Sequence, residues 1–183
     1  MTAIVGLVDD GVVYIGGDSA TTDGWLNQST MAGSKVFERS DFLFGVAGSI
    51  RALQLVEHKF QIPWCPVEVP CETYMVTQFL DSMRECFLDS GYLKKQHEEE
   101  EMDSAFLIGH EGKLFTLHVD FALVENNRGY AAIGSGAEIA QGAMYATADR
   151  DDLTPKERIR IALRAAEQHN AGVRRPFIIK SLK

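Results

Sequence analysis

The sequence has little of what marks disulfide-rich, membrane-spanning or nucleic-acid-binding proteins. Its 183 residues include only three cysteines, too few and too odd in number for a disulfide framework. No apolar stretch approaches the ~18 residues that a transmembrane helix needs, and the first residues lack the basic segment and apolar run of a signal peptide. Lysine and arginine number 18 against 26 aspartate and glutamate, a net charge of −8, so no basic surface is expected to bind nucleic acid. We therefore expect a soluble, cytoplasmic α/β protein whose residues 1–183 form one domain.

The common catalytic and metal-binding motifs are missing as well. The sequence contains no G-x-S-x-G, no Walker A loop, no H-E-x-x-H and no G-x-G-x-x-G. No C-x-x-C or Cys/His pair has the spacing of a zinc site. Five histidines are scattered along the chain and are expected to be exposed or hydrogen-bonded within the fold: His58, His97, His110, His118 and His169. Neither a metal nor a cofactor is expected.

Hydrophobic patterning predicts strands and helices in an order that does not alternate regularly. Short apolar runs bounded by turns predict strands at residues 3–8, 12–17, 35–37, 42–46, 104–109, 114–119, 129–133 and 176–182. Apolar spacings of three and four predict helices at residues 49–60, 72–90, 138–148 and 154–169. The last begins with a Thr154–Glu157 capping box, and Gly172 is the expected cap beyond its C-terminal end. Residues 19–34 are expected to form a loop or irregular hairpin, and the charged residues 94–101 a solvated loop. Hairpins and paired helices favour an α+β fold with helices outside two sheets.

The N-terminus offers one unusual chemical group. Thr2 follows Met1, and its side chain is small enough for Met1 to be removed. Removal would give Thr2 both a hydroxyl nucleophile and a free α-amine, whose pKa of about 7.7–8.0 suits a general base near neutral pH. Such an amine can take the hydroxyl proton directly or through one water. A second-position threonine is common, so this feature alone is not specific.

Further segments that follow Thr2 in a fixed order make the pattern as a whole specific. After the start Thr-Ala-Ile-Val-Gly come residues 15–21 (Ile-Gly-Gly-Asp-Ser-Ala-Thr), 35–37 (Lys-Val-Phe), 44–48 (Phe-Gly-Val-Ala-Gly) and 132–136 (Ala-Ile-Gly-Ser-Gly). This combination resembles the proteasome β-subunits and the HslV-type peptidases, which are N-terminal nucleophile hydrolases. The resemblance covers most of the chain and is densest in residues 2–55 and 129–178. It implies a four-layer αββα sandwich of two antiparallel sheets flanked by helices.

The resemblance also implies roles for individual residues. Thr2 would be the nucleophile, and its freed amine the proton acceptor. Lys35 would be the cation beside Thr2 that lowers the cost of deprotonating Oγ, and Asp18 would be its ionic partner. Ser135 would hydrogen-bond the amine and orient it.

On the substrate side, the resemblance implies a backbone oxyanion donor and a strand that pairs with the peptide. The N–H of Gly48 would donate to the oxyanion of the tetrahedral intermediate. The backbone at Thr21 and Thr22 would add an extended peptide as a further strand. The implied activity is that of a threonine peptidase in a homo-oligomeric ring, acting on peptides or unfolded proteins. An ATP-dependent unfoldase, if one feeds the ring, would be a separate protein because this chain lacks a Walker motif.

The sequence departs from the family at one place and leaves two other functions open. Proteasome subunits carry an Asp and a Ser near the turn after the last long helix, where this chain has residues 167–172 (Glu-Gln-His-Asn-Ala-Gly). Either His169 or Asn170 is expected to take over the orienting role. The mismatch keeps open an inert structural or assembly subunit, and the same nucleophile also suits an amidase for small molecules. If Met1 stays attached, the nitrogen of Thr2 is an amide and cannot act as a base.

Overall fold

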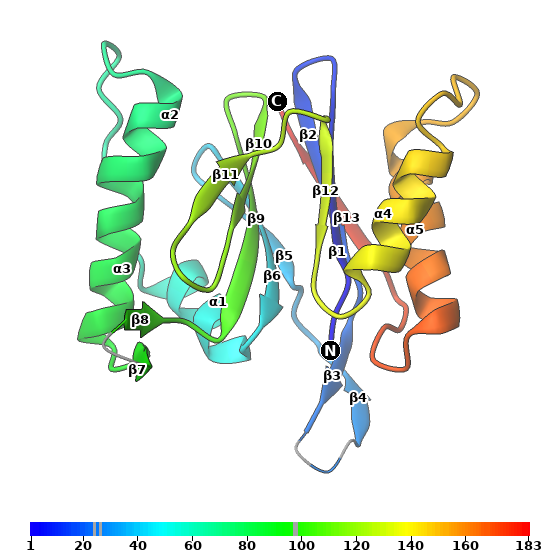
Figure 1. Ribbon diagram of the computed structural model, residues 1–183, viewed down its shortest axis with the longest axis horizontal. Coiled ribbons are helices and arrows are strands. Elements are labelled where there is room, and N and C mark those ends of the chain that lie inside the picture. The colour runs from blue at the N-terminus through cyan, green and yellow to red at the C-terminus, as the bar shows by residue number, and fades with distance from the viewer. Residues whose placement is uncertain (24, 26, 97–98) are drawn as a thin grey trace.

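Two antiparallel sheets lie face to face between two layers of helices in the computed structural model, which describes residues 1–23, 25, 27–96 and 99–183 (Figure 1). The four-stranded sheet has the order β12-β1-β2-β13, made of β1 (Ile4–Asp9), β2 (Val12–Gly17), β12 (Tyr130–Ile133) and β13 (Ile178–Leu182). The five-stranded sheet has the order β11-β10-β9-β6-β5, made of β5 (Val36–Arg39), β6 (Phe42–Gly48), β9 (Ser104–His110), β10 (Lys113–Leu117) and β11 (Leu123–Glu125).

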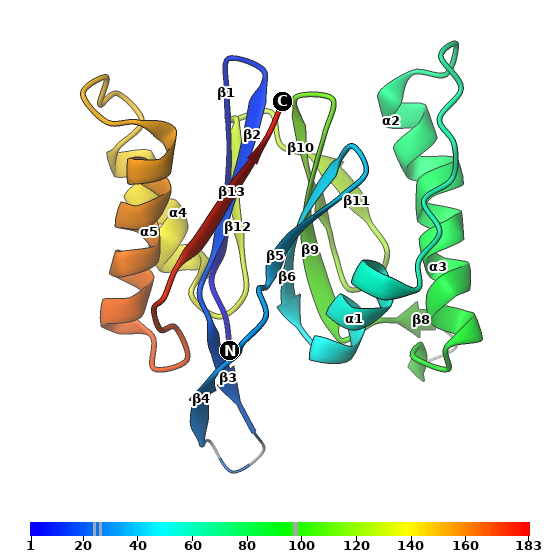
Figure 2. The same ribbon diagram turned by 180° about the vertical axis from the view of Figure 1, so that it is seen from behind.

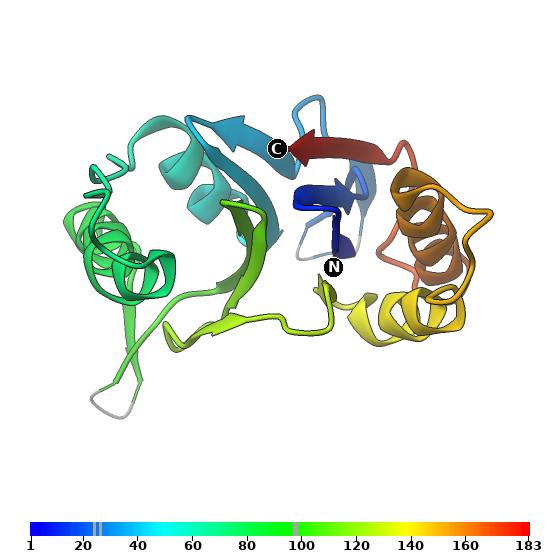
Figure 3. The same ribbon diagram turned by 90° about the horizontal axis from the view of Figure 1, so that it is seen from above.

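The helices cover the outer face of each sheet, as the view from above makes clear (Figure 3). On the five-stranded side lie α1 (Ile50–His58), α2 (Cys71–Tyr74), the π-helical segment η1 (Met75–Phe79) and α3 (Leu80–Asp89). On the four-stranded side lie α4 (Ala137–Ala146) and α5 (Pro155–His169). The predicted four-layer αββα sandwich is therefore confirmed.

Three separate apolar clusters hold the layers together. The cluster between the sheets is aliphatic and includes Ile4, Ile15 and Leu107. The cluster under α1–α3 is rich in aromatic rings, with Phe42, Phe79 and other side chains fully buried, and a third cluster joins the four-stranded sheet to α4 and α5. Because both faces of each sheet are covered, the strands read as continuous apolar runs rather than alternating ones.

Several elements differ from the sequence-based expectation. Residues 20–30 contain a short hairpin of β3 (Ala20–Thr22) and β4 (Gln28–Thr30), the second of the two forms expected for residues 19–34. The charged run contains paired strands β7 (Lys94–Gln96) and β8 (Glu99–Glu101), where a loop was expected. Strand β11 was not predicted, because three residues are too few to show a period. The predicted cap at Gly172 is wrong, since α5 ends at His169 and its C-cap is Asn170, in an extended conformation. His97 lies outside the described residues.

The topology brings distant segments to one edge of the sandwich. β1 begins at this edge, where β6 and β12 end, and the β3–β4 hairpin projects from it beside the N-terminus (Figures 1 and 2). Among the described helices, none is both long and apolar enough to cross a bilayer.

Candidate active site

Thr2 lies at this edge with its side chain buried, immediately before β1. Its hydroxyl accepts a hydrogen bond from the Lys35 ammonium at 2.8 Å and donates one to the carbonyl of Met1 at 2.6 Å. Its backbone N–H donates to the hydroxyl of Ser135 at 3.1 Å. The hydroxyl and the nitrogen that the sequence singled out therefore both contact polar side chains from distant parts of the chain.

Lys35 and Asp18 form a buried ion pair beside Thr2. Their Nζ and Oδ1 atoms are 2.9 Å apart, and the side chains are 7% and 0% exposed. The Asp18 carboxylate also accepts from three backbone N–H groups at 3.0–3.3 Å, those of Ala3, Ala20 and Arg174. Burial lowers the pKa of the Lys35 ammonium, and the charge of Asp18 opposes that effect. With four donors on its carboxylate, Asp18 is held firmly and fixes the position of Lys35 against the hydroxyl of Thr2.

Ser135 is held in turn by Asn170. The amide nitrogen of Asn170 donates to the Ser135 carbonyl at 2.8 Å, while its Oδ1 accepts from the N–H of Gly172 at 3.0 Å. The Ser135 hydroxyl lies 3.4 Å from both Asn170 Oδ1 and the Thr2 carbonyl, and its single proton serves one of them at a time. His169 is exposed. Of the two candidates for the orienting role, Asn170 is therefore the one in contact with the site.

Two glycines let the backbone approach closely here. Gly134 has φ 94°, and a Cβ atom on it would overlap the carbonyl of Thr2. Gly48 has φ 125°, and a Cβ atom on it would overlap the carbonyl of Asp103. Ser49 N–H donates to the Asp103 carbonyl, which makes Gly48–Ser104 a non-hydrogen-bonded pair of the β6–β9 ladder. The N–H of Gly48 consequently points away from β9.

An open cavity of about 320 Å³ brings most of these groups together, and its lining includes Met1, Thr2, Ala47, Gly48, Asp103, Ser104, Ala105, Val119, Gly134 and Ser135. Met1 also packs so closely on Gly172 that a Cβ atom there would overlap its side chain. With Met1 attached, the Thr2 hydroxyl donates to the Met1 carbonyl rather than standing free. The wall of the cavity therefore contains the hydroxyl of Thr2, with Met1 directly beside it.

The predicted substrate-binding residues stand outside this lining, on the neighbouring strand β3. Thr21 pairs with Ser29 of β4, and their hydroxyls are 2.7 Å apart. Hydrogen bonds from Met31 N–H to the Ser19 carbonyl, and from Asp23 N–H to the Asn27 carbonyl, place the odd-numbered residues of β3 in the ladder with β4. The N–H and C=O of Thr22 therefore point away from β4, toward the free edge of the hairpin.

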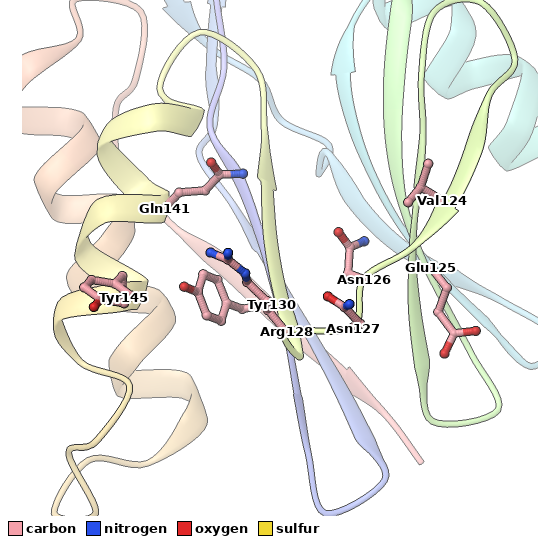
Figure 4. A pocket seen from close by; sticks show the side chains of 8 residues that line it. All are labelled: Val124, Glu125, Asn126, Asn127, Arg128, Tyr130, Gln141 and Tyr145. Atoms are coloured by element: carbon pink, nitrogen blue, oxygen red, sulfur yellow. The ribbon is translucent and has the colours of Figure 1, made fainter.

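A second hollow, of about 340 Å³, lies between β11, β12 and α4 (Figure 4). Its described lining includes Glu125, Arg128, Tyr130, Gln141 and Tyr145, and the Arg128 and Tyr130 side chains lie near each other between the strand and the helix. None of the predicted site residues is among the described residues that line it. The concentration of hydrogen-bonded nucleophile, cation and serine around Thr2 makes the smaller cavity the candidate active site.

Solved structures with the same fold were found across the full length of the chain. BPH from Thiobacillus denitrificans is similar with a TM-score of 0.85 and 19% identity, covering 100% of this chain and 98% of that one, and its complex with epoxomicin gives 0.84. HslV from Trypanosoma brucei gives 0.71 at 19% identity, covering 100% and 99%, and Anbu (ancestral beta-subunit) from Yersinia bercovieri gives 0.70 at 16%, covering 99% and 81%. No family model and no curated protein matches the sequence. The resemblance to HslV-type peptidases is thus confirmed at the level of the fold.

Proposed function

We propose that this chain is a threonine-type endopeptidase subunit of a proteasome-like ring, with Thr2 as the nucleophile after removal of Met1. The observation that carries the proposal is the pair of contacts on Thr2: Lys35 on its hydroxyl at 2.8 Å and Ser135 on its nitrogen at 3.1 Å. The likeness to HslV, and to a BPH bound to epoxomicin, supports the same activity.

In the first step the freed amine of Thr2 takes the hydroxyl proton, directly or through one water, and Oγ attacks the peptide carbonyl carbon. The Lys35 ammonium lowers the cost of the developing alkoxide, because a positive charge 2.8 Å from the oxygen favours its ionised form. With Met1 attached, the nitrogen of Thr2 donates to the Ser135 hydroxyl; after removal, the free amine would keep this hydrogen bond and be held in place by it. Asn170 holds Ser135 in turn.

Attack by Oγ places the negative charge on the carbonyl oxygen of the substrate, in a tetrahedral intermediate. The carbonyl double bond forms again when this intermediate collapses. The N–H of Gly48, directed away from β9, would donate to that oxyanion. Collapse of the intermediate breaks the C–N bond, and the departing amine takes the proton from the α-amine of Thr2. Water then hydrolyses the ester on Oγ, with the α-amine again accepting a proton. The free edge of Thr22 would hold the peptide as an added strand.

An intact-mass experiment tests the nucleophile. A peptide vinyl sulfone adds an oxygen nucleophile to its vinyl carbon and leaves a stable ether, so Met-free protein should gain one adduct that peptide mapping assigns to Thr2. Thr2→Ala also permits Met removal and should gain none, whereas Thr30→Ala, at an exposed threonine on β4, should react like the wild type. Met-free wild type without an adduct, or an adduct on Thr2→Ala, would overturn the proposal.

A second function, an inert structural or assembly subunit, is favoured by the contacts of Met1. Its carbonyl accepts from the Thr2 hydroxyl, and its side chain packs on Gly172. If Met1 is retained in cells, Thr2 has no free amine, and the fold would serve assembly alone. N-terminal sequencing of protein purified from its own source separates the two functions. An amidase for small molecules would require the site to open to solvent in a monomer or dimer.

We further propose that identical subunits form a ring that encloses the cavity and that it works in the cytoplasm. An ATP-dependent unfoldase, if one feeds the ring, would be a separate protein. Native mass spectrometry gives both the subunit number and the state of Met1 in one measurement. A monomer at micromolar concentration would contradict the ring, without bearing on the chemistry of Thr2.

A further inference from the structure

Three side chains of kinds that bind transition metals meet at the opposite end of the five-stranded sheet. Cys71 is the first residue of α2, His110 the last of β9, and Glu111 follows in the β9–β10 turn. One ligand atom from each lies within 4.8 Å of the other two. Ser104, at the start of β9, lines the cavity around Thr2, so the seven-residue strand separates the two places by about 20 Å. In Figure 1, α2 and the β9–β10 turn lie at the top and the N-terminus at the lower edge.

His110 supplies the most specific sign of a ligand. Its side chain is 1% exposed, and its Nδ1 lies 3.0 Å from the backbone carbonyl of Asp41. A carbonyl only accepts, so Nδ1 carries a proton, and in the neutral ring Nε2 has a free lone pair. Within the described part of the chain, Nε2 has no hydrogen-bond partner, and it lies 4.0 Å from Oε1 of Glu111. That separation is too long for a hydrogen bond. A buried nitrogen of this kind normally has a partner, and here its free lone pair faces the carboxylate and the thiol.

The ring of His110 is also oriented as the rings of metal-bound histidines are. It stacks on Phe42 with the ring centroids 3.9 Å apart and the planes 6° apart, and Tyr74 lies against it at 6.1 Å. Metal-bound histidines typically donate their second ring N–H to a backbone carbonyl or a carboxylate, which fixes the tautomer and the ring. The hydrogen bond to Asp41 does this here.

We propose that Cys71, His110 and Glu111 bind a divalent transition-metal ion such as Zn²⁺ through Sγ, Nε2 and a carboxylate oxygen, with water as the fourth ligand. A thiolate, an imidazole and a carboxylate together suit an ion of borderline softness, and three protein ligands are enough for tetrahedral zinc with one open position. The thiol proton is released to solvent when the ion binds.

The surroundings of the proposed metal site indicate how an ion reaches it and how binding affects the stability of the fold. Glu111 is exposed and Cys71 is half-buried, so an ion can reach these two ligands from solvent. The bound ion would join the start of α2 to the end of β9, where Tyr74 already packs on His110 and the Cys71 side chain hydrogen-bonds Glu111. Because only the folded chain brings these ligands together, binding should raise the stability of the fold.

Cobalt provides the test, since a Co²⁺–thiolate bond absorbs in the near ultraviolet. Tag-free full-length protein, stripped with a chelator, is titrated with Co²⁺ and then with Zn²⁺. We expect one equivalent of Co²⁺ to give the charge-transfer absorption and Zn²⁺ to remove it. Zn²⁺ should also raise the melting temperature.

Variants decide whether these residues are the ligands. Cys71→Ser should abolish the absorption, and Glu111→Gln should weaken binding at least about tenfold, because losing a ligand costs no less than losing an outer-shell partner. Cys86→Ser, the matched control on α3, should bind like the wild type. Glu111 is exposed, so its variant remains informative if Cys71→Ser folds poorly. Absence of stoichiometric binding at micromolar ion, or undiminished binding by folded Cys71→Ser and Glu111→Gln, would overturn the proposal.

Discussion

Replacing Asp18 by asparagine tests how the buried pair beside Thr2 is built. The Asp18 carboxylate accepts four hydrogen bonds, two on each oxygen: Lys35 and the N–H of Ala3 on Oδ1, and the N–H groups of Ala20 and Arg174 on Oδ2. An amide has one oxygen, so whichever way it turns, its NH₂ group faces two donors and two hydrogen bonds are lost. Lys35 also loses its negative partner while remaining buried.

The size of the effect follows from those losses. Breaking a buried ion pair by removing one partner costs about 3–5 kcal/mol, so the free energy of unfolding of Asp18→Asn should fall by that amount. Lys35→Met removes only one of the four donors and leaves the carboxylate with three backbone N–H groups. A hydrogen bond to a charged group contributes about 1.5–3 kcal/mol, so Lys35→Met should lose no more than this.

Urea unfolding followed by circular dichroism measures both variants against one surface control. Lys113 and Glu125 are 2.8 Å apart, but their side chains are 40% and 38% exposed, so Glu125→Gln should lose under about 1 kcal/mol. A loss below about 1 kcal/mol for Asp18→Asn, or one no larger than that of Lys35→Met, would refute the reasoning that Asp18 is the anchor of the pair.

Three further substitutions test other parts of the molecule. Gly48→Ala should slow inhibitor labelling of the N-terminal threonine by about 10²–10³, because a Cβ atom there displaces the N–H proposed for the oxyanion; Gly142→Ala, with nothing within 4 Å of its Cβ, should label normally, and equal rates would contradict the role. Thr154→Ala, which removes the side-chain cap of α5, should lose about 1 kcal/mol in urea unfolding, and Thr154→Ser should recover most of it; an unchanged midpoint would contradict the cap. Hydrogen bonds from Arg175 lower the pKa of Glu167 below its ordinary 4.5, so the stability they give is complete above that pH and lost as the pH falls through the folded-state value. Glu167→Gln should therefore lose about 1 kcal/mol or less at pH 7 and nothing at pH 2, and equal losses at both would contradict the pairing.

Local patterns account for most of the predicted elements. The capping box at Thr154 and the apolar spacing behind it place α5 at residues 155–169, because both signals act within one or two turns of the helix. The π-helical turn within residues 75–79 left no such signal, since it inserts a residue into the helix without changing the types of side chain. The sequence likewise could not distinguish the short hairpin β3–β4 from a loop. Most of its residues are polar and at least partly exposed, so apolar and polar side chains do not alternate along the strands.

Some residues of the candidate site could likewise be named from the sequence, and others could not. Thr2, Asp18, Lys35 and Ser135 were named from the order of short segments. In the structure Lys35 contacts the side chains of Thr2 and Asp18, and the Ser135 hydroxyl contacts the backbone nitrogen of Thr2. For the residue that orients Ser135, the sequence left a choice between His169 and Asn170. The direction in which a side chain leaves the end of a helix depends on how the chain continues, and the sequence does not show this. Here the extended conformation of residue 170 turns the amide toward Ser135.

The sequence by itself predicted the layer architecture and named Thr2 as the candidate nucleophile, because apolar period, turn residues and motif order are local properties of the chain. Tertiary structure alone decided which hydrogen bonds hold Asp18, that Gly48 points its N–H away from β9, and that Met1 packs against Gly172. It also decided that Cys71 and His110 meet, although no spacing in the sequence indicates a metal site. These are contacts between segments far apart along the chain, and only the packing of the sheets and helices determines their geometry.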